Sequence, residues 1–277
     1  MTTSSNTTTI TTSTSNNPLY YGWGWLRSHI YNRFILSMTT GWYQVVLEDL
    51  PPQSKLLDVG IGTAGALLAC QKLVEEKQLQ IIGIDYDEQY VQQAQKAIQE
   101  KDASNSIQVL SMSVYDVEEN WKELVSQVSP NILTNFRDRD LLDAVYFSGS
   151  FSLLPHWEDA LLQVSKLLKR QGGKIYITQT YQKETTVFPW QQWLLGWIKP
   201  MLKYLTTIDF GPLVMAKDME LFYQQFATQH SSQGWKLIKH EIIPNSVNNP
   251  WQAAYLTVFQ VDDNDGTHET QEYSSRG

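Results

Sequence analysis

Apolar residues in the middle of the chain fall into short runs, separated by segments with a different period. Short runs rich in Ile, Leu and Val are typical of buried strands, and spacings of three and four residues are typical of helices. We predict strands at 55–59, 80–85, 106–112, 143–150 and 174–180, and helices at 62–77, 87–100, 117–128 and 158–170. Strands that alternate with helices indicate a parallel, doubly wound α/β sheet.

The regular alternation ends after residue 180. Residues 181–233 are typical of a mostly helical, aromatic segment, and WKLIKHEIIP and WQAAYLTVFQV then follow as two further strands. The loop between these two strands, PNSVNNP, is too short for a crossover helix, so we expect an antiparallel pair. The complete prediction is an α/β fold with a doubly wound, mostly parallel seven-stranded sheet, an antiparallel C-terminal hairpin and a helical cap. Ligands of such sheets bind at the carboxyl ends of the strands.

Polar tails flank a single folded domain in this prediction. Residues 1–17 are almost entirely Thr, Ser and Asn, and residues 262–277 are acidic and polar, so we expect both tails to be disordered. Residues 18–261 then form one domain. Its parts are an N-terminal helical cap (18–50), a ligand-binding core (51–180), a helical lid insertion (181–233) and the C-terminal strands (234–261).

Charge and cysteine content narrow the classes of partner. The formal net charge is −8 and no cluster of Lys or Arg reverses it, so we expect no binding to nucleic acid. A single cysteine, Cys70, excludes an internal disulfide framework and favours a reducing compartment. The sequence contains no apolar run that could span a membrane and no targeting segment, so we expect a cytoplasmic protein. The five histidines show no metal-ligand spacing, and no metal is expected.

The stretch LLDVGIGTAGALL, residues 56–68, joins the first predicted strand to the first helix through a glycine turn. Gly60, Gly62 and Gly65 let the backbone bend tightly and approach a ligand, with the free N–H groups of the helix start facing it. Dinucleotide-binding enzymes show the same spacing. The turn alone therefore leaves a dinucleotide, a phosphate and S-adenosylmethionine open as ligands.

Three later segments accompany this turn, in order along the chain. They are GIDYDEQYVQQAQ from Gly83, SVYD from Ser113 and DAVYFSGSFSLLPHWEDALLQVSKLLKRQGGKIYI from Asp143. Together with Asp58 before the glycines, they make residues 55–180 resemble the class I S-adenosylmethionine-dependent methyltransferases. The resemblance implies S-adenosyl-L-methionine as the cofactor and methyl transfer as the activity. The chain departs from the family at Ala64, where the third glycine of the turn usually stands.

The polar residues at the predicted strand ends suit this cofactor. The carboxylate of Asp85 can accept hydrogen bonds from both ribose hydroxyls, whereas Asp87 is better placed to cap the following helix. Asp58 is expected to orient the turn and to reach the methionine ammonium through water or backbone. Tyr86 and Tyr115 are expected to pack beside the adenine ring, and Asp116 to accept a hydrogen bond from the adenine amino group. Ser148, with Gly149, is expected to lie beside the methionine portion. The expected cofactor-binding residues are Asp58, Gly60, Gly62, Asp85, Tyr86, Tyr115, Asp116 and Ser148.

The acceptor of the methyl group is expected to be a small molecule with an oxygen, nitrogen or sulfur nucleophile. Enzymes of this family that methylate amino groups of nucleic acids or of glutamine usually carry an Asn-Pro-Pro-Tyr type motif after the fourth strand. This chain has no such motif there, and it is acidic. Trp and Tyr crowd residues 18–34 and 181–233, which are expected to cover the acceptor. The expected substrate-binding residues are Tyr20, Trp23, Trp190, Trp193 and Asp209. The candidate catalytic residues are Tyr21, His29 and His156, although turn chemistry at a helix start explains His156 equally well.

Three other hypotheses stay open at this point. Trp190, Trp193 and Trp197 fall on one face of a predicted helix that would suit a membrane interface, as in a methyltransferase of lipids or quinone precursors. The second hypothesis is an NAD-dependent oxidoreductase, and the third is a cofactor-binding protein without catalytic activity. The sequence leaves the oligomeric state open.

Overall fold

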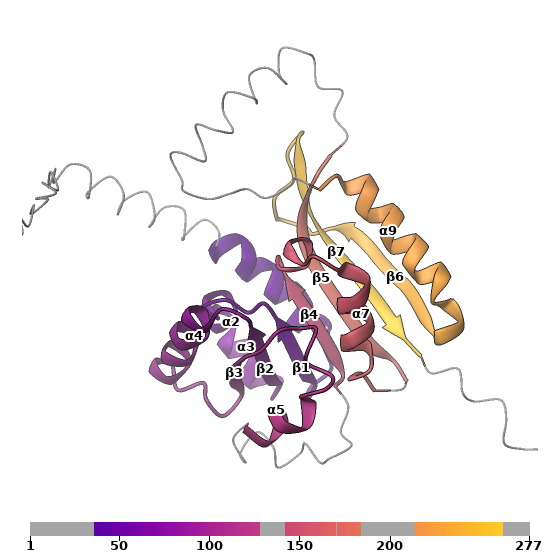
Figure 1. Ribbon diagram of the computed structural model, residues 1–277. Helices are drawn as coiled ribbons and strands as arrows, with labels where there is room; N and C mark the ends of the chain where they lie inside the picture. Colours follow the sequence, from indigo (N-terminus) through magenta and orange to yellow (C-terminus); the bar gives the residue numbers. More distant parts are fainter. Residues whose placement is uncertain (1–35, 128–141, 170, 184–213, 263–277) are drawn as a thin grey trace, which may run out of the picture.

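Seven strands form one mixed sheet in the computed structural model, which describes residues 36–127, 142–169, 171–183 and 214–262 (Figure 1). Their order across the sheet is β3-β2-β1-β4-β5-β7-β6. The first five strands pair in parallel, whereas β7 is antiparallel to both β5 and β6. The predicted fold class is therefore confirmed. The strands are β1 (Lys55–Val59), β2 (Gln80–Asp85), β3 (Ile107–Ser111), β4 (Ala144–Ser148), β5 (Gly173–Gln182), β6 (Trp235–Ile242) and β7 (Gln252–Val261).

Helices cover both faces of this sheet (Figure 1). The N-terminal helix, residues 36–49, shares one apolar cluster with α2, α3 and α4. A second cluster, on the other face, contains the apolar side chains of α7 and α9. The described helices are α2 (Gly65–Ala69), α3 (Gln71–Glu76), α4 (Glu88–Glu100), α5 (Trp121–Gln127), α7 (Trp157–Ser165) and α9 (Ala216–Gln229), with 3₁₀ turns η1 (Phe151–Leu153) and η2 (Ser231–Gln233).

The central strand β1 is apolar because both of its faces are covered by helices. Leu56 belongs to the cluster under the N-terminal helix, whereas Leu57 and Val59 belong to the cluster under α7 and α9. This alternation follows from the two-residue period of a strand. Asp58 interrupts the pattern, since its side chain is fully buried on the same face as Leu56. Burying a carboxylate is costly, which suggests that Asp58 serves a purpose other than packing.

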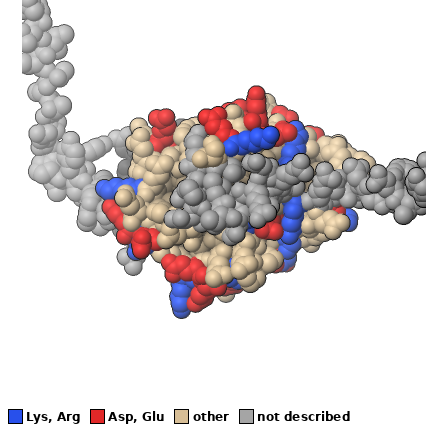
Figure 2. All heavy atoms as spheres, turned by 90° about the horizontal axis from the view of Figure 1, so that it is seen from below, with Lys and Arg blue, Asp and Glu red and all other residues tan. Residues whose placement is uncertain are grey.

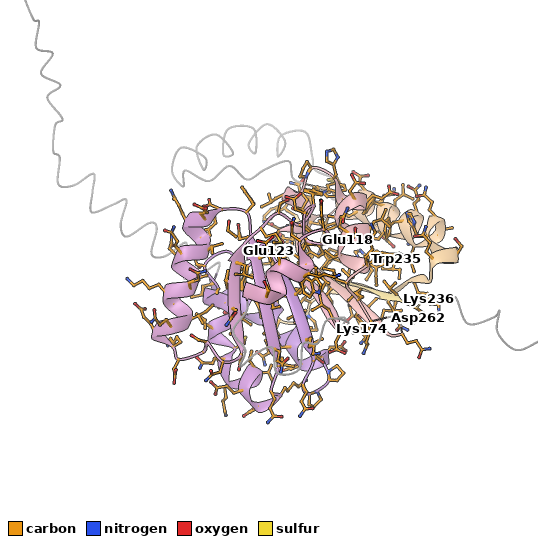
Figure 3. All side chains as sticks on the ribbon, turned by 60° about the horizontal axis from the view of Figure 1, so that its bottom comes forward. Glu118, Glu123, Lys174, Trp235, Lys236 and Asp262 are labelled. Atoms are coloured by element: carbon orange, nitrogen blue, oxygen red, sulfur yellow. The ribbon has the colours of Figure 1, made fainter. Side chains whose placement is uncertain are left out.

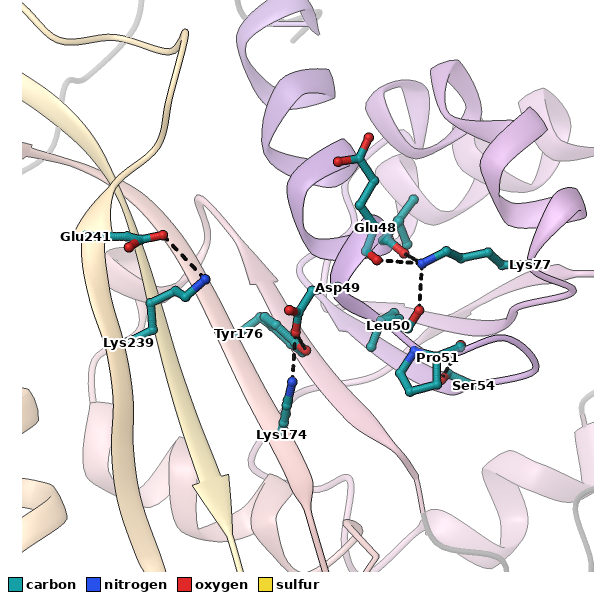
Figure 4. Close-up of polar contacts among 11 residues, drawn as sticks. Glu48, Asp49, Leu50, Pro51, Ser54, Lys77, Lys174, Tyr176, Lys239 and Glu241 are labelled. Atoms are coloured by element: carbon teal, nitrogen blue, oxygen red, sulfur yellow. Dashed lines mark hydrogen bonds and ion pairs between the residues drawn. The ribbon is translucent and has the colours of Figure 1, made fainter.

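The C-terminal end of the N-terminal helix is held by two sets of polar contacts (Figure 4). The ammonium group of Lys77 donates to the carbonyl oxygens of Leu47, Glu48 and Leu50 over 2.9, 2.6 and 2.7 Å. These carbonyls have no partner within the helix, so a cation at this position satisfies them and complements the helix dipole. On the sheet side, Asp49 accepts from the hydroxyl of Tyr176 and from Lys174. The helix is thereby fixed against β5.

The segment predicted as one helix over 62–77 forms two helices instead, which corrects the prediction. The chain passes through Ala64 in the left-handed region, with φ of 57°, so the first helix begins only at Gly65. The amide of Cys70 then bonds to the carbonyl of Leu67, a tightened turn that ends α2 before α3 begins. Ala69, the last residue of α2, is exposed, whereas Leu67 and Leu68 are buried.

Other predicted boundaries shift by a few residues. Residues 114–120 form turns, so α5 begins at Trp121 rather than at residue 117. Helix α7 ends at Ser165, and β5 continues to Gln182, pairing with β7 along its whole length. Within the predicted helical insertion the structure describes α9, whereas residues 184–213 lie outside the described residues. In the described ranges, none of the helices has the length and apolar character needed to cross a bilayer.

Polar contacts connect the start of β6 to the residue that follows β7, at the open end of the hairpin. Lys236 and Asp262 lie side by side there, at 3.1 Å, and Asp262 also accepts from the amide of Gly172 (Figure 3). Nearby, the ring of Trp235 packs edge-on against Phe226 of α9. Viewed from below, the described surface carries Lys and acidic side chains interspersed over it (Figure 2). The described part of that face therefore carries charges of both signs.

Candidate functional site

The chain leaves β1 through a turn that needs glycine at residue 60. Gly60 has φ of +73°, and its amide donates to the carbonyl of Ile84 on β2 over 2.8 Å. A Cβ at this position would lie 2.5 Å from the Cβ of Ser150. Ser150 follows β4, and its hydroxyl donates to the carbonyl of Val59 over 2.6 Å. Gly60 therefore allows the loops after β1 and β4 to close against each other.

Gly62, the second glycine of the turn, borders open space. Its φ is +59°, and a Cβ built on it would meet no heavy atom within 4 Å. Its amide donates to Oδ2 of Asp85 over 2.9 Å, which fixes the turn to the tip of β2. The arrangement leaves room over the backbone of the turn, as a ligand that approaches the main chain closely requires.

The carboxylate of Asp85 is largely buried, with 8% of the residue exposed, yet it keeps hydrogen-bonding capacity. Oδ2 accepts from Gly62, and Oδ1 accepts from the amide of Asp87 over 3.0 Å. An ionised carboxylate can accept about four hydrogen bonds, so about two further sites remain, which is what a diol needs. Asp87, as predicted, caps α4 by accepting from the amide of Gln89 over 2.8 Å.

Asp58 lies one residue before the end of β1 and is the most unusual group of the site. Its Oδ2 accepts from the hydroxyl of Tyr43 over 2.6 Å, whereas the buried Oδ1 finds no hydrogen-bond partner among the described residues. Burial raises the pKa of this carboxyl to about 7; the bond from Tyr43 opposes the rise and the nearby charge of Asp85 adds to it. A buried acceptor with a free oxygen is suited to a cationic donor.

The loop after β3 reaches across to the loop after β4. The backbone amide of His156 donates to the hydroxyl of Tyr115 over 3.1 Å, and the two rings lie 6.2 Å apart. Asp116 is exposed in the same loop. Tyr86, beyond the tip of β2, is 84% exposed, so little of its ring packs against the described protein. Tyr86 and Asp116 are thus exposed, whereas the hydroxyl of Tyr115 is engaged with the backbone of His156.

Two hollows in the described surface differ in position. One, of about 400 Å³, lies at the start of α7 and is lined by His156, Trp157 and Phe222, among others. The other, of about 670 Å³, lies among polar residues at the opposite edge of the sheet, near Lys55 and Gln80. The smaller hollow lies beside the loop that follows β4, and neither hollow is lined by the glycine turn, Asp58 or Asp85.

The structure brings together the predicted residues at the tips of β1, β2 and β4. Ser148 ends β4 next to Tyr43 and Tyr146, whose hydroxyls it contacts. Tyr43 and Ser150 were not predicted: Tyr43 lies outside the quoted motifs, Ser150 lies within the segment from Asp143 but was not singled out, and both act through partners on other elements. Several predictions lie outside the described residues and stay predictions, including the Trp-rich membrane hypothesis: Tyr20, Tyr21, Trp23, His29, Trp190, Trp193, Trp197 and Asp209.

Comparison with known proteins gives one family match, and no curated protein matches the chain. The model of the family described as "Protein-L-isoaspartate(D-aspartate) O-methyltransferase (PCMT)" matches residues 25–125. The match covers little more than a third of the chain and ends before β4. It therefore concerns the half of the sheet that carries the glycine turn, Asp58 and Asp85.

Solved structures with low sequence identity share the fold. The MccD protein is 14% identical, with a TM-score of 0.52 over 80% of this chain and 96% of that one. An S-adenosylmethionine-dependent methyltransferase from Aquifex aeolicus is 15% identical, with a TM-score of 0.50 over 79% and 88%. The [4+2]-cyclase SpnF is 12% identical, with a TM-score of 0.52 over 80% and 82%. Together with the strand order and the glycine turn, these findings show that the chain has the fold of the class I S-adenosylmethionine-dependent methyltransferases.

Proposed function

We propose that this protein transfers the methyl group of S-adenosylmethionine to a small-molecule acceptor. The observation that carries the proposal is the pair of carboxylates, Asp58 and Asp85, at the tips of neighbouring strands beside the glycine turn. The segments of β1 to β4, with the loops that follow these strands, contain no Lys or Arg; they are 56–71, 81–95, 106–121 and 144–165. Such a site favours a ligand with positive charge, and S-adenosylmethionine carries a sulfonium and an ammonium group.

The same electrostatics argue against a dinucleotide. A pyrophosphate on the glycine turn would lie close to the buried carboxylate of Asp58, and the amide of Gly62, which could otherwise bind it, already donates to Asp85. The hypothesis of an NAD-dependent oxidoreductase is therefore the weaker one. The fold alone does not decide the reaction, since a [4+2]-cyclase shares it. The proposal rests on the site.

The residues present fit the cofactor part by part. The free Oδ1 of Asp58 suits the ammonium group, and the remaining acceptor sites of Asp85 suit the two ribose hydroxyls. The open space beside Gly62 leaves room for the part of the cofactor that connects the ammonium group to the ribose. When bound, the cofactor supplies a methyl group already activated by the sulfonium. The protein's task is then to orient the acceptor in line with the methyl carbon and to exclude water.

We place the acceptor beside the loop that follows β4, next to the 400 Å³ hollow. A base is needed only where the acceptor loses a proton during attack, and His156, exposed at this hollow, is our candidate. Trp157 and Phe222 supply apolar walls, with their rings 5.5 Å apart. The residues assigned to the cofactor by this proposal are Asp58, Gly60, Gly62, Asp85, Tyr86, Tyr115, Asp116 and Ser148.

A protein acceptor is the second candidate function, because the matching family model is named for an enzyme that methylates isoaspartyl residues of proteins. Its match ends at residue 125, before the loop after β4 where we place the acceptor. A peptide containing isoaspartate and a panel of small phenols, amines and thiols, each offered with labelled methyl donor, would separate the two. Label transferred to the peptide alone would overturn the small-molecule proposal.

Binding of the cofactor is tested by isothermal titration with S-adenosylmethionine and, separately, with NADH. We expect S-adenosylmethionine to bind and Asp85→Ala to weaken its binding at least about tenfold, since about 1.4 kcal/mol of hydrogen bonding to a charged group is lost. Asp102→Asn removes an exposed carboxylate near the other end of α4 and serves as the matched control. Binding of NADH alone, or unchanged affinity in Asp85→Ala, would contradict the proposed site.

A further inference from the structure

Tyr43 makes the one hydrogen bond that the described residues offer to the carboxylate of Asp58. It lies on the N-terminal helix, is 3% exposed, and donates its hydroxyl proton to Oδ2 over 2.6 Å. Oδ1 of the same carboxylate is buried without a described partner. The two oxygens are thus inequivalent: one is occupied by the helix and the other is free.

The tyrosine is held in place from its other side. Its ring meets that of Tyr146 edge-on at 87°, with the centroids 5.0 Å apart, a favoured aromatic geometry. The hydroxyl of Tyr146 in turn shares a 2.8 Å hydrogen bond with Oγ1 of Thr178 on β5. With its ring fixed in this way, the hydroxyl of Tyr43 has a set position from which it determines the rotation of the Asp58 carboxylate.

We propose that Tyr43 is a positioning residue for the cofactor, which holds Oδ2 of Asp58 so that Oδ1 faces the ammonium group of the bound methionine portion. This inference rests on the proposed function. It adds a residue outside the recognised motifs, and it connects the N-terminal helix to the occupancy of the site. Tyr43 acts through Asp58 and needs no contact with the cofactor itself.

In this proposal, binding of the cofactor is coupled to the protonation state of Asp58. Burial holds the pKa of Asp58 at about 7, with Tyr43 lowering it and Asp85 raising it, while burial raises the pKa of Tyr146 beside them so that it stays neutral. A cation against Oδ1 favours the ionised carboxylate. Below neutral pH, binding therefore releases the proton of Asp58 to solvent, and the ligand keeps its own protons. Above the pKa of Asp58, binding releases none.

Proton release is measured by titrating S-adenosylmethionine into the full-length protein in two buffers with different heats of ionisation. We expect release approaching one proton at pH 6 and close to none at pH 8.5. Tyr43→Phe removes the bond that favours the charged carboxylate, so the pKa of Asp58 rises. If the pKa rises by about one unit, we expect binding to weaken about tenfold at pH 6 and only about 1.3-fold at pH 8.5, where most of the carboxylate stays ionised in both proteins.

Tyr176→Phe is the matched control. It also removes a hydroxyl that donates to a carboxylate, that of Asp49, on the same face of the sheet but away from the turn. We expect it to leave the affinity and the proton release unchanged. An equal loss of affinity at both pH values in Tyr43→Phe, with proton release as in the wild type, would reduce Tyr43 to a packing residue and overturn the proposal.

Asp58→Asn covers the case in which Tyr43→Phe does not fold. It keeps an oxygen for Tyr43 but cannot ionise, so proton release must vanish with it; release that persists in Asp58→Asn would also overturn the proposal. Failure of the proposed function has a different signature. The wild-type protein would then bind no S-adenosylmethionine at any pH.

Discussion

Replacing Asp58 by Asn is expected to stabilise the folded protein above neutral pH while it weakens the proposed cofactor site. The carboxylate is fully buried in the central strand, and burial raises its pKa from an ordinary value of 3.8 to about 7. The folded protein therefore holds this proton more tightly than the unfolded chain does. Stability from Asp58 is fully present below about pH 4 and is lost as the pH rises through 7.

The magnitude follows from the size of the shift. About three pKa units, at about 1.4 kcal/mol each, correspond to about 4 kcal/mol of free energy of unfolding lost by pH 8. Asparagine keeps an oxygen to accept from Tyr43 and carries no charge at any pH. Between pH 5 and pH 8, the stability of Asp58→Asn relative to the wild type should rise by about 2 to 3 kcal/mol.

Urea unfolding at a series of pH values gives this difference directly, because the slopes of the two proteins should be the same. Asp102→Asn, at an exposed position, controls for the general effect of removing one negative charge. A difference in free energy that stays constant from pH 5 to pH 8 would refute the reasoning. So would a difference that falls, since it would mean that Asp58 is stabilised in its ionised form by the fold.

Two further sets of substitutions test the turn and the N-terminal helix. Gly62→Ala places a side chain at φ of +59° and should cost about 1 to 2 kcal/mol of stability, measured by urea unfolding. Gly60→Ala should cost more, because its Cβ would meet Ser150, and Ser150→Gly in the same chain should recover part of the loss; no recovery would place the strain elsewhere. Lys77→Met leaves three helix-end carbonyls without their cation and should cost about 2 kcal/mol, whereas Lys72→Met, on the exposed side of α3, should change thermal unfolding little.

Much of the fold could be predicted from the sequence because its strands are buried on both faces. Such strands are continuous apolar runs, and β2 was predicted with the bounds that the structure shows. Once the strand ends were predicted, polar residues at these ends, such as Asp85, were expected to lie together at one edge of the sheet. Boundaries that depend on local backbone geometry were missed, as at Ala64, whose left-handed conformation delays the start of α2.

The side-chain contacts that hold the site together could not be predicted from the sequence. Tyr43 and Asp58 are 15 residues apart, on a helix and a strand, and no spacing rule connects them. Ser150 packs on Gly60 across 90 residues of chain, and its role depends on how closely two loops approach. Periodicity predicts which face of an element is buried. It does not predict which two polar groups on separate elements will meet.

The position of β7 between β5 and β6 governs the order in which the molecule can be completed. β6 is made first but borders β7 alone, and β5 pairs with β7 over its ten residues, Gly173 to Gln182. During synthesis one edge of β5 therefore stays unpaired, and β6 has no neighbouring strand, until residues 252–261 have left the ribosome. A nascent chain halted before that point exposes two strands capable of joining neighbouring chains. Aggregation during expression is thus expected to depend on how quickly this last strand is delivered.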